Sequence, residues 1–355
     1  MYNTDMEEKN FYQSRNIKNL EKIEKLISDL PHFVAEYFLG IENQTSTLTR
    51  LNYAYDLRIF FHYISARCLK NKNVQEITLQ DLEKITSTDI ERFLSYLSAY
   101  EFNGTVETCN ERAKARKLST IRAMFKYFFR KDKISVDNAA KVAMPKLHDK
   151  EIIRLEVNEI VDLLNCAENG LGMTGQQRAY HNKTKIRDVA ILTLFLGTGI
   201  RISELVGLNN NDIDFTTNSF KVTRKGGNQT ILYFSDEVAE ALARYIAYKE
   251  EEKDLPQDKN ALFLSLQMKR ISIRAVENLV QKYSKIVTPL KKISPHKLRS
   301  TYGTQLYRET QDIYVVADVL GHKDVNTTKK HYAAISEDIR RSVAGKVKLR
   351  DDHKD

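Results

Sequence analysis

Hydrophobic residues recur every three or four positions along most of the first 140 residues, the spacing of helices that bury one face. Ser46 precedes one such segment, and Ser87 or Thr88 precedes another; small hydroxyl side chains of this kind cap helix N-termini. The pattern predicts a compact bundle of four or five helices joined by short loops. The predicted helices of the bundle cover residues 31–39, 46–69, 89–100 and 107–130, and residues 15–30 predict one amphipathic helix ahead of it.

The periodicity is lost over residues 138–150, where Pro145 disfavours a helical conformation in the residue before it, so we place a domain boundary there. Residues 168–185 are polar and rich in glycine, and they predict a long loop. Residues 219–234 alternate between apolar and polar side chains around Gly226-Gly227-Asn228, which predicts a β-hairpin. The remaining segments predict helices over residues 156–167, 187–199, 236–250, 273–283, 295–309, 312–320, 327–333 and 336–347.

These patterns together predict a mainly α fold with two domains and a small antiparallel β-sheet in the second domain. The predicted parts are an extension with one amphipathic helix (1–30), a helical domain (31–142), a linker (143–152), an α-rich domain (153–347) and a charged tail (348–355).

The charge of the chain adds a candidate partner. Fifty-six Lys and Arg residues against 47 Asp and Glu residues give a net charge of +9, and this balance favours nucleic acid as a partner before a membrane. No run of 18 apolar residues predicts a membrane span. The three cysteines are far apart and show no metal-ligand spacing, so we expect no metal site and reduced thiols.

The first half of the segment 107–130 is strongly basic and has two interpretations. A run of charges is usually a solvated helix face. Clustered Lys and Arg residues also bind duplex DNA, because they release counterions from its phosphates. The candidate DNA-binding residues are Arg112, Lys114, Arg116, Lys117 and Arg122.

The stretch TGIRISEL, residues 198–205, places Arg201 between two apolar segments, with Glu204 three residues later. An arginine at such a junction needs an anionic partner, because an unpaired buried charge is unfavourable. The stretch SPHKLRSTYGT, residues 294–304, predicts a helix start with His296 and Arg299 on one face. A helix N-terminus that carries an imidazole and a guanidinium suits one phosphate group.

Two further stretches become candidates for the site only when they are considered together with Arg201, His296 and Arg299. Lys225 lies at the tip of the predicted hairpin, where a lysine is ordinarily just solvated. In LGHKDVNTTKKHY, residues 320–332, His322 follows a glycine and Tyr332 follows ten residues later. Taken alone, Tyr332 fits an ordinary core tyrosine as well as a nucleophile.

The order and context of these six residues resemble those of tyrosine recombinases, the phage integrase family, and most closely the Xer-type single recombinases. The resemblance covers about residues 30 to 345 and implies a helical core-binding domain followed by a catalytic domain. It assigns phosphate binding to Arg201, Arg299 and His322 and makes Tyr332 the nucleophile that forms a 3′-phosphotyrosine. It also implies that His296 is the general base and Lys225 the general acid, and Glu204 would hold Arg201.

The same resemblance implies an enzyme of the cytoplasm and nucleoid that needs no metal, ATP or other cofactor. Its partners would be a double-stranded recombination site, a second protomer on that site, and a tetramer assembled through the C-terminal helix. A DNA translocase is a further candidate partner. Xer-type resolution of chromosome dimers and integration or excision of a mobile element both remain open. A non-catalytic DNA-binding protein and a type IB topoisomerase are the competing classes.

Overall fold

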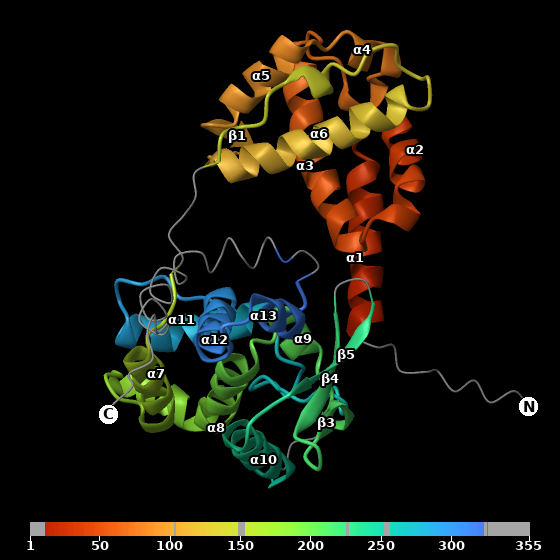
Figure 1. Ribbon diagram of the computed structural model, residues 1–355. Helices are drawn as coiled ribbons and strands as arrows, with labels where there is room; N and C mark the ends of the chain where they lie inside the picture. Colours follow the sequence, from red (N-terminus) through yellow and green to blue (C-terminus); the bar gives the residue numbers. More distant parts are fainter. Residues whose placement is uncertain are drawn as a thin grey trace, which may run out of the picture. The chain divides into compact units, whose positions relative to one another are not determined.

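The computed structural model describes residues 11–102, 104–147, 153–224, 227–251, 256–322 and 325 (Figure 1). The chain divides into two compact units, residues 1–150 and 151–355. Each unit buries hydrophobic side chains in a core of its own. No helix in the described ranges is long and apolar enough to cross a membrane.

The first unit is a helical bundle with an aromatic core, in which α3 and α6 pack together (Figure 1). Its helices are α1 (Phe11–Ile27), α2 (His32–Gly40), α3 (Thr47–Arg67), α4 (Leu79–Glu83), α5 (Ser87–Tyr96) and α6 (Glu111–Phe129), with single turns η1 (Glu42–Gln44), η2 (Val74–Glu76) and η3 (Ala139–Lys141). Phe60, Phe93 and Phe125 are fully buried, and the rings of Phe60 and Phe93 meet edge to face at 5.4 Å. Ile23 and Leu26 of α1 join the same core.

The helix starts of this unit follow local capping rules. The hydroxyl of Ser46 accepts the N–H of Thr49 at 3.2 Å, which confirms the predicted cap of α3. Helix α5 is capped by Thr86, one residue before the predicted position. Thr86 and Asp89 bond each other's backbone N–H groups in a reciprocal capping box. The predicted cap at Ser87 or Thr88 was therefore wrong by one or two residues.

A short hairpin replaces the predicted helix ends on either side of residue 104. Strands β1 (Tyr100–Phe102) and β2 (Thr105–Glu107) pair antiparallel, with Gly104 at φ +75° in the turn. Helix α5 consequently ends at Tyr96, and α6 begins only at Glu111, where Asn110 caps it. The sequence prediction missed this hairpin because each of its strands is only three residues long.

The second unit is built around α8, which packs against α7, α10 and α12 (Figure 1). Its helices are α7 (Val157–Asn169), α8 (Gly175–Thr198), α9 (Ile202–Gly207), α10 (Asp236–Glu251), α11 (Ile273–Val287), α12 (Pro295–Thr310) and α13 (Ile313–Leu320), with one single turn η4 (Asn210–Asp212). The second half of α8 is apolar all round: Ile191, Leu194 and Phe195 are fully buried, as expected for a helix covered on several sides.

The first half of α8 contradicts the predicted loop over residues 168–185. The helix already begins at Gly175, where Thr174 and Gln177 form its capping box. Its inner face is polar: His181, Thr184 and Asp188 are buried at helical spacing. A polar face of this kind gives no hydrophobic periodicity, so the sequence pattern did not reveal the helix.

The sheet has three antiparallel strands in the order β3 (Ile213–Asp214), β4 (Ser219–Thr223), β5 (Gln229–Tyr233). Phe220 lies opposite Leu232, both are buried, and Ile231 on the other face is exposed. The predicted hairpin is confirmed, as is the mainly helical class with a small antiparallel sheet. The helices predicted over residues 327–333 and 336–347 lie outside the described residues.

Candidate active site

Gly199 brings α8, α12 and α13 close together. Its φ of +61° ends α8 in the left-handed conformation, and its N–H donates to the carbonyl of Phe195 at 3.0 Å. A Cβ at this position would lie 2.5 Å from the ring of Tyr302 and 2.9 Å from Cδ2 of Leu320. Only glycine permits this approach, and the turn that follows places Arg201 at the start of α9.

Arg201 is held at both ends of its guanidinium. Its Nη1 donates to Oε1 of Glu204 at 2.8 Å, and its Nη2 donates to the carbonyl of Gly321 at 2.9 Å. The other carboxylate oxygen of Glu204 accepts the Arg201 N–H at 3.0 Å. Glu204 is buried, so the expectation that it holds Arg201 agrees with this geometry.

Arg299, in the second turn of α12, ties α8 to α13. It is 5% exposed. Its Nη1 donates to the carbonyl of Gly199 at 2.6 Å, and its Nη2 donates to the carbonyl of Leu320. Hydrogen bonds from a charged donor are about twice as strong as neutral ones, so this side chain fixes two helix ends with respect to each other.

A third arginine, Arg224, reaches the same place from the hairpin. It follows β4 directly, and its Nη2 donates to the carbonyl of Val319 at 3.0 Å. The sequence interpretation singled out the neighbouring Lys225 and missed Arg224. No local pattern identifies Arg224, because its partner carbonyl lies on a distant helix.

These three arginines converge on three consecutive carbonyls, those of residues 319–321, at the C-terminal end of α13. We call Arg201, Arg224 and Arg299 the arginine cluster. The last carbonyls of a helix lack partners within the helix and carry its negative dipole end, so they attract cations. His322 comes next in the chain, and its N–H donates to the carbonyl of Ala317 at 2.8 Å. His322 therefore follows directly after the three carbonyls that the guanidiniums bind.

The arginine cluster holds more positive than negative charge. Three guanidiniums lie there, and among the described residues the buried carboxylate in contact with them is Glu204; Asp318 on α13, whose charge also acts on Arg224, is exposed. Carbonyls hold the guanidiniums in place but do not neutralise them. Such a site favours an anion with several oxygens, and guanidinium forks match phosphate geometry.

The other predicted catalytic residues are placed only in part. His296 is exposed on the first turn of α12, and its carbonyl accepts the hydroxyl of Ser300 at 3.0 Å. Ser294 precedes that helix, and Pro295 occupies its first turn. Lys225 and Tyr332 lie outside the described residues, so their roles stay predictions.

The basic residues of α6 separate into two kinds. The ammonium of Lys117 is buried and lies 2.8 Å from Oδ1 of Asp56. Arg116 binds the other carboxylate oxygen of Asp56. Lys117 thus has a structural partner and no access to DNA, so its assignment as a DNA contact is corrected; its burial was hidden because Asp56 lies far away in the sequence.

The three remaining candidates on α6 keep some access to a partner. Arg122 bonds the carbonyls of residues 139, 140 and 142, which holds η3 against the helix. Lys114 donates to the hydroxyl of Ser98 at 2.6 Å. Arg112 is exposed, which leaves Arg112 and the half-exposed Arg116 as the better placed candidates for phosphate contact.

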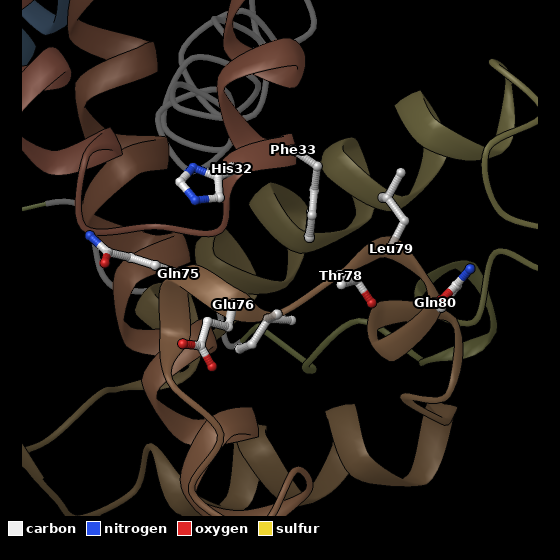
Figure 2. Close-up of a pocket in the computed structure, with 8 residues that line it drawn as sticks. His32, Phe33, Gln75, Glu76, Thr78, Leu79 and Gln80 are labelled. Carbon is white, nitrogen blue, oxygen red and sulfur yellow. The ribbon is translucent and has the colours of Figure 1, made fainter.

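The first unit also contains a hollow of about 420 Å³, formed where the start of α2 faces the segment from η2 to α4 (Figure 2). Its lining residues are His32, Phe33 and residues 75–80. Glu76 is the one acidic side chain there, so the hollow does not repeat the chemistry of the arginine cluster. In the part of the chain that the structure describes, no group of three or more His, Cys, Asp or Glu residues could hold a metal ion.

Comparison with known proteins assigns both halves of the chain. Residues 154–338 match the phage integrase family, and residues 34–132 match the N-terminal SAM-like domain of phage integrases. The chain is 34% identical to the tyrosine recombinase XerC of Caldanaerobacter subterraneus subsp. tengcongensis over 299 residues, covering 82% of this chain and 79% of the relative. It is 29% identical to the tyrosine recombinase XerS of Streptococcus agalactiae over 354 residues, covering 90% and 96%.

Solved structures agree on the fold. The XerH site-specific recombinase bound to palindromic difH substrate is similar, with a TM-score of 0.64, 16% identity, and coverage of 96% of this chain and 98% of that one. The Tn1549 transposon integrase in complex with circular intermediate DNA gives a TM-score of 0.61, 19% identity, and coverage of 87% and 97%. On the family match and the XerC relative, the chain belongs to the phage integrase family and is a tyrosine recombinase.

Proposed function

We propose that this protein is a Xer-type site-specific recombinase that cuts and rejoins DNA through a 3′-phosphotyrosine on Tyr332. The observation that supports the proposal is the arginine cluster at the end of α13. Arg201 and Arg299 are fixed on adjacent carbonyls next to His322, with positive charge in excess. Preorganised donors of this kind stabilise the charge that develops on a phosphate during transfer.

In the cleavage step, the phenol oxygen of Tyr332 attacks phosphorus and the bond from phosphorus to the 5′-oxygen breaks. His296 accepts the phenol proton, and the ammonium of Lys225 gives a proton to the departing 5′-oxygen. A tyrosine with an ordinary pKa of about 10 needs such a base, because the neutral phenol is a weak nucleophile. Rejoining reverses these transfers.

Arg201, Arg299 and His322 would bind the non-bridging oxygens of the scissile phosphate. Their hydrogen bonds strengthen as negative charge grows on those oxygens, so they stabilise the transition state more than the ground state. The phosphotyrosine keeps the energy of the broken phosphodiester bond, and so the cycle runs without ATP.

The relatives named XerC and XerS favour resolution of chromosome dimers over integration of a mobile element. The proposed partners are a double-stranded recombination site, a second protomer on that site, and a homotetramer in synapsis joined through residues 336–347. The enzyme would act in the cytoplasm at the nucleoid, and a DNA translocase would be its further partner. The identity of the DNA site that the protein recombines distinguishes chromosome dimer resolution from integration of a mobile element.

The test begins with chromosomal fragments that the purified protein selects by binding. A nicked suicide duplex of the selected site should give a covalent adduct that survives denaturation, and Tyr332→Phe should give none. Tyr180→Phe is the matched control, because Tyr180 is exposed on α8 roughly 28 Å along the helix from Gly199; it should cleave normally. An adduct formed by Tyr332→Phe would contradict the nucleophile. Selection of the ends of a mobile element would contradict the Xer-type role.

A further inference from the structure

Arg224 lies where β4 ends, and Lys225 follows it in the sequence. The N–H of Arg224 donates to the carbonyl of Asn228 at 2.7 Å, and its carbonyl accepts the N–H of Gly227 at 3.0 Å. Both backbone groups of Arg224 therefore close the hairpin. The backbone of the residue that precedes Lys225 in the sequence is therefore fixed on both sides.

The side chain of Arg224 joins the hairpin to the end of α13. Its Nη2 donates to the carbonyl of Val319 at 3.0 Å. The guanidinium also rests against Gly321: a Cβ on that residue would lie 1.4 Å from Nη1 and 2.3 Å from Cζ of Arg224. Gly321, at φ +60°, leaves just the space that this side chain fills. One residue thus connects the strand before Lys225 to the turn that carries His322.

The surroundings of the Arg224 guanidinium are unfavourable for stability. Among the described residues, Nε and Nη1 of Arg224 are buried and have no hydrogen-bond partner. Burial lowers the pKa of Arg224; the Glu204 carboxylate opposes that shift, and the charge of Arg201 adds to it. Buried polar groups in proteins nearly always have partners. Local choices that oppose stability are expected at functional sites, so the exception at Arg224 points to a role in the reaction.

We propose that Arg224 is a positioning residue for departure of the 5′-oxygen: it fixes the end of β4, one residue before Lys225 in the sequence, to the end of α13. The residue before the proposed general acid is then joined to the helix end where Arg201 and Arg299 would bind the phosphate. This inference rests on the proposed function, in which Lys225 protonates the 5′-oxygen. Arg224 acts through Val319 and Gly321 and does not itself contact the phosphate.

Replacing the bridging 5′-oxygen with sulfur tests this role directly. A thiol has a pKa of about 8.5, far below that of an alcohol, so the sulfur leaves as a thiolate without receiving a proton. Loss of general acid catalysis lowers the rate by about 10² to 10⁴ fold. Cleavage of the oxygen substrate should therefore fall by about 10² fold or more in a variant at Arg224. Cleavage of the sulfur substrate should stay within the same order of magnitude as wild type.

Arg224→Met is the informative variant. Methionine fills similar space but removes the buried donors that lack partners, so the protein should fold and melt at or above the wild-type temperature. A purely structural role predicts no loss of cleavage in this well-folded variant. The positioning role predicts loss on the oxygen substrate and rescue on the sulfur substrate. Arg224→Lys, which keeps the charge and can still donate to Val319, should recover part of the oxygen cleavage.

Gly321→Ala gives a second route to the same effect, because the added Cβ displaces the guanidinium while leaving Arg224 in the sequence. It should show the same selective loss on the oxygen substrate. Combined with Arg224→Met, it should add little further loss, since both changes break one connection. Losses that multiply in the double variant would contradict the shared connection.

Two controls separate this inference from the proposed function. Lys225→Ala should also be rescued by sulfur; failure of that rescue would refute the general acid assignment itself. Arg299→Ala should lose cleavage on both substrates, because it acts on the phosphate. The inference is overturned if Lys225→Ala is rescued while Arg224→Met either cleaves both substrates like wild type or loses both equally.

Discussion

Two groups of charged side chains in this protein differ in the partners that their cations bind. In the first unit, the fully buried carboxylate of Asp56 receives Arg116, the ammonium of Lys117 at 2.8 Å and the hydroxyl of Thr120 at 3.0 Å. In the second unit, the arginine cluster converges on backbone carbonyls at the end of α13. The Asp56 group directs its donors onto a single carboxylate. Each guanidinium of the arginine cluster binds a neutral carbonyl, and Arg201 also binds the carboxylate of Glu204.

This difference in partners distinguishes charged groups that stabilise the fold from charged groups that can bind a ligand. A cation that lies on a carboxylate has its counterion within the protein, and removing either partner leaves the other buried alone. A guanidinium that lies on a carbonyl is positioned but keeps its charge. Arg201 and Arg299 can therefore offer their charge to a phosphate, whereas Lys117, which is buried on Asp56, cannot. Variants in the two groups should accordingly fail in different assays.

The largest expected effect is on catalysis. Arg299→Ala should lower the rate of DNA cleavage by about 10³ fold or more, because arginines that stabilise a transferring phosphoryl group contribute 10³ to 10⁵ fold. Single-turnover cleavage of a suicide duplex measures it. Arg308→Ala on the same helix removes a half-exposed ion pair with Glu156 at 3.4 Å and should cleave normally. Equal losses in the two variants would show that Arg299 only supports the helix.

A change at Asp56 should act on stability instead. Asp56→Ala should lower the free energy of unfolding by about 3–5 kcal/mol, because Lys117 is left buried without its partner. Urea unfolding measures the difference. Glu36→Ala is the matched control: its pair with Lys133 is 2.5 Å long but exposed, so about 1 kcal/mol or less is expected. The rate of DNA cleavage per folded molecule should not change. A loss of more than tenfold in that rate would contradict the purely structural role of Asp56.

A second carboxylate of the structural kind, Asp188, makes the stability depend on pH. Burial would raise the pKa of Asp188, but Arg187 and Lys282, each 2.8 Å away, hold it below its ordinary value. A lowered folded-state pKa gives stability that is present above about pH 4 and is lost as the pH falls through the folded pKa. Asp188→Asn should therefore destabilise most near pH 7, with a gap that shrinks in acid. A gap that stays constant with pH would refute the assignment.

The smallest effect concerns DNA binding by α6. Arg112→Ala should weaken binding slightly and reduce the slope of log affinity against log salt by about one, as expected for one lost phosphate contact. Lys117→Met should leave that slope unchanged, because Lys117 is bound to Asp56. The opposite pattern, with Lys117 changing the slope and Arg112 not, would restore Lys117 as a DNA contact.

Local sequence patterns predicted those parts of the fold that depend on interactions between residues close together in the sequence. The hairpin of β4 and β5 was predicted from alternation and a glycine turn, and Ser46 as a cap from a hydroxyl before an apolar run. Both features are confirmed. The first half of α8 was missed because its inner face is polar. The ring of His181 lies 3.1 Å from the hydroxyl of Tyr283 on α11, and that hydroxyl donates to Asp188 at 2.8 Å.

The residues of the candidate site also divide into those that local motifs predict and those that depend on distant contacts. Arg201, Arg299 and His322 were predicted from short motifs, and the structure brings them to one helix end. Arg224 and Lys117 could not be judged from the sequence, because their partners lie far along the chain. Burial of Lys117 depends on Asp56, 61 residues away. Contacts of this kind become visible only when the packing of the helices is known.

The most direct test of the central claim replaces the scissile phosphate with a neutral methylphosphonate. If Arg201 and Arg299 serve to balance the charge of that phosphate, a neutral group no longer needs them. Arg299→Ala should then cleave the methylphosphonate site at a rate close to that of wild type on the same site, although it fails on the phosphodiester. An equally large deficit of Arg299→Ala on both substrates would contradict the account.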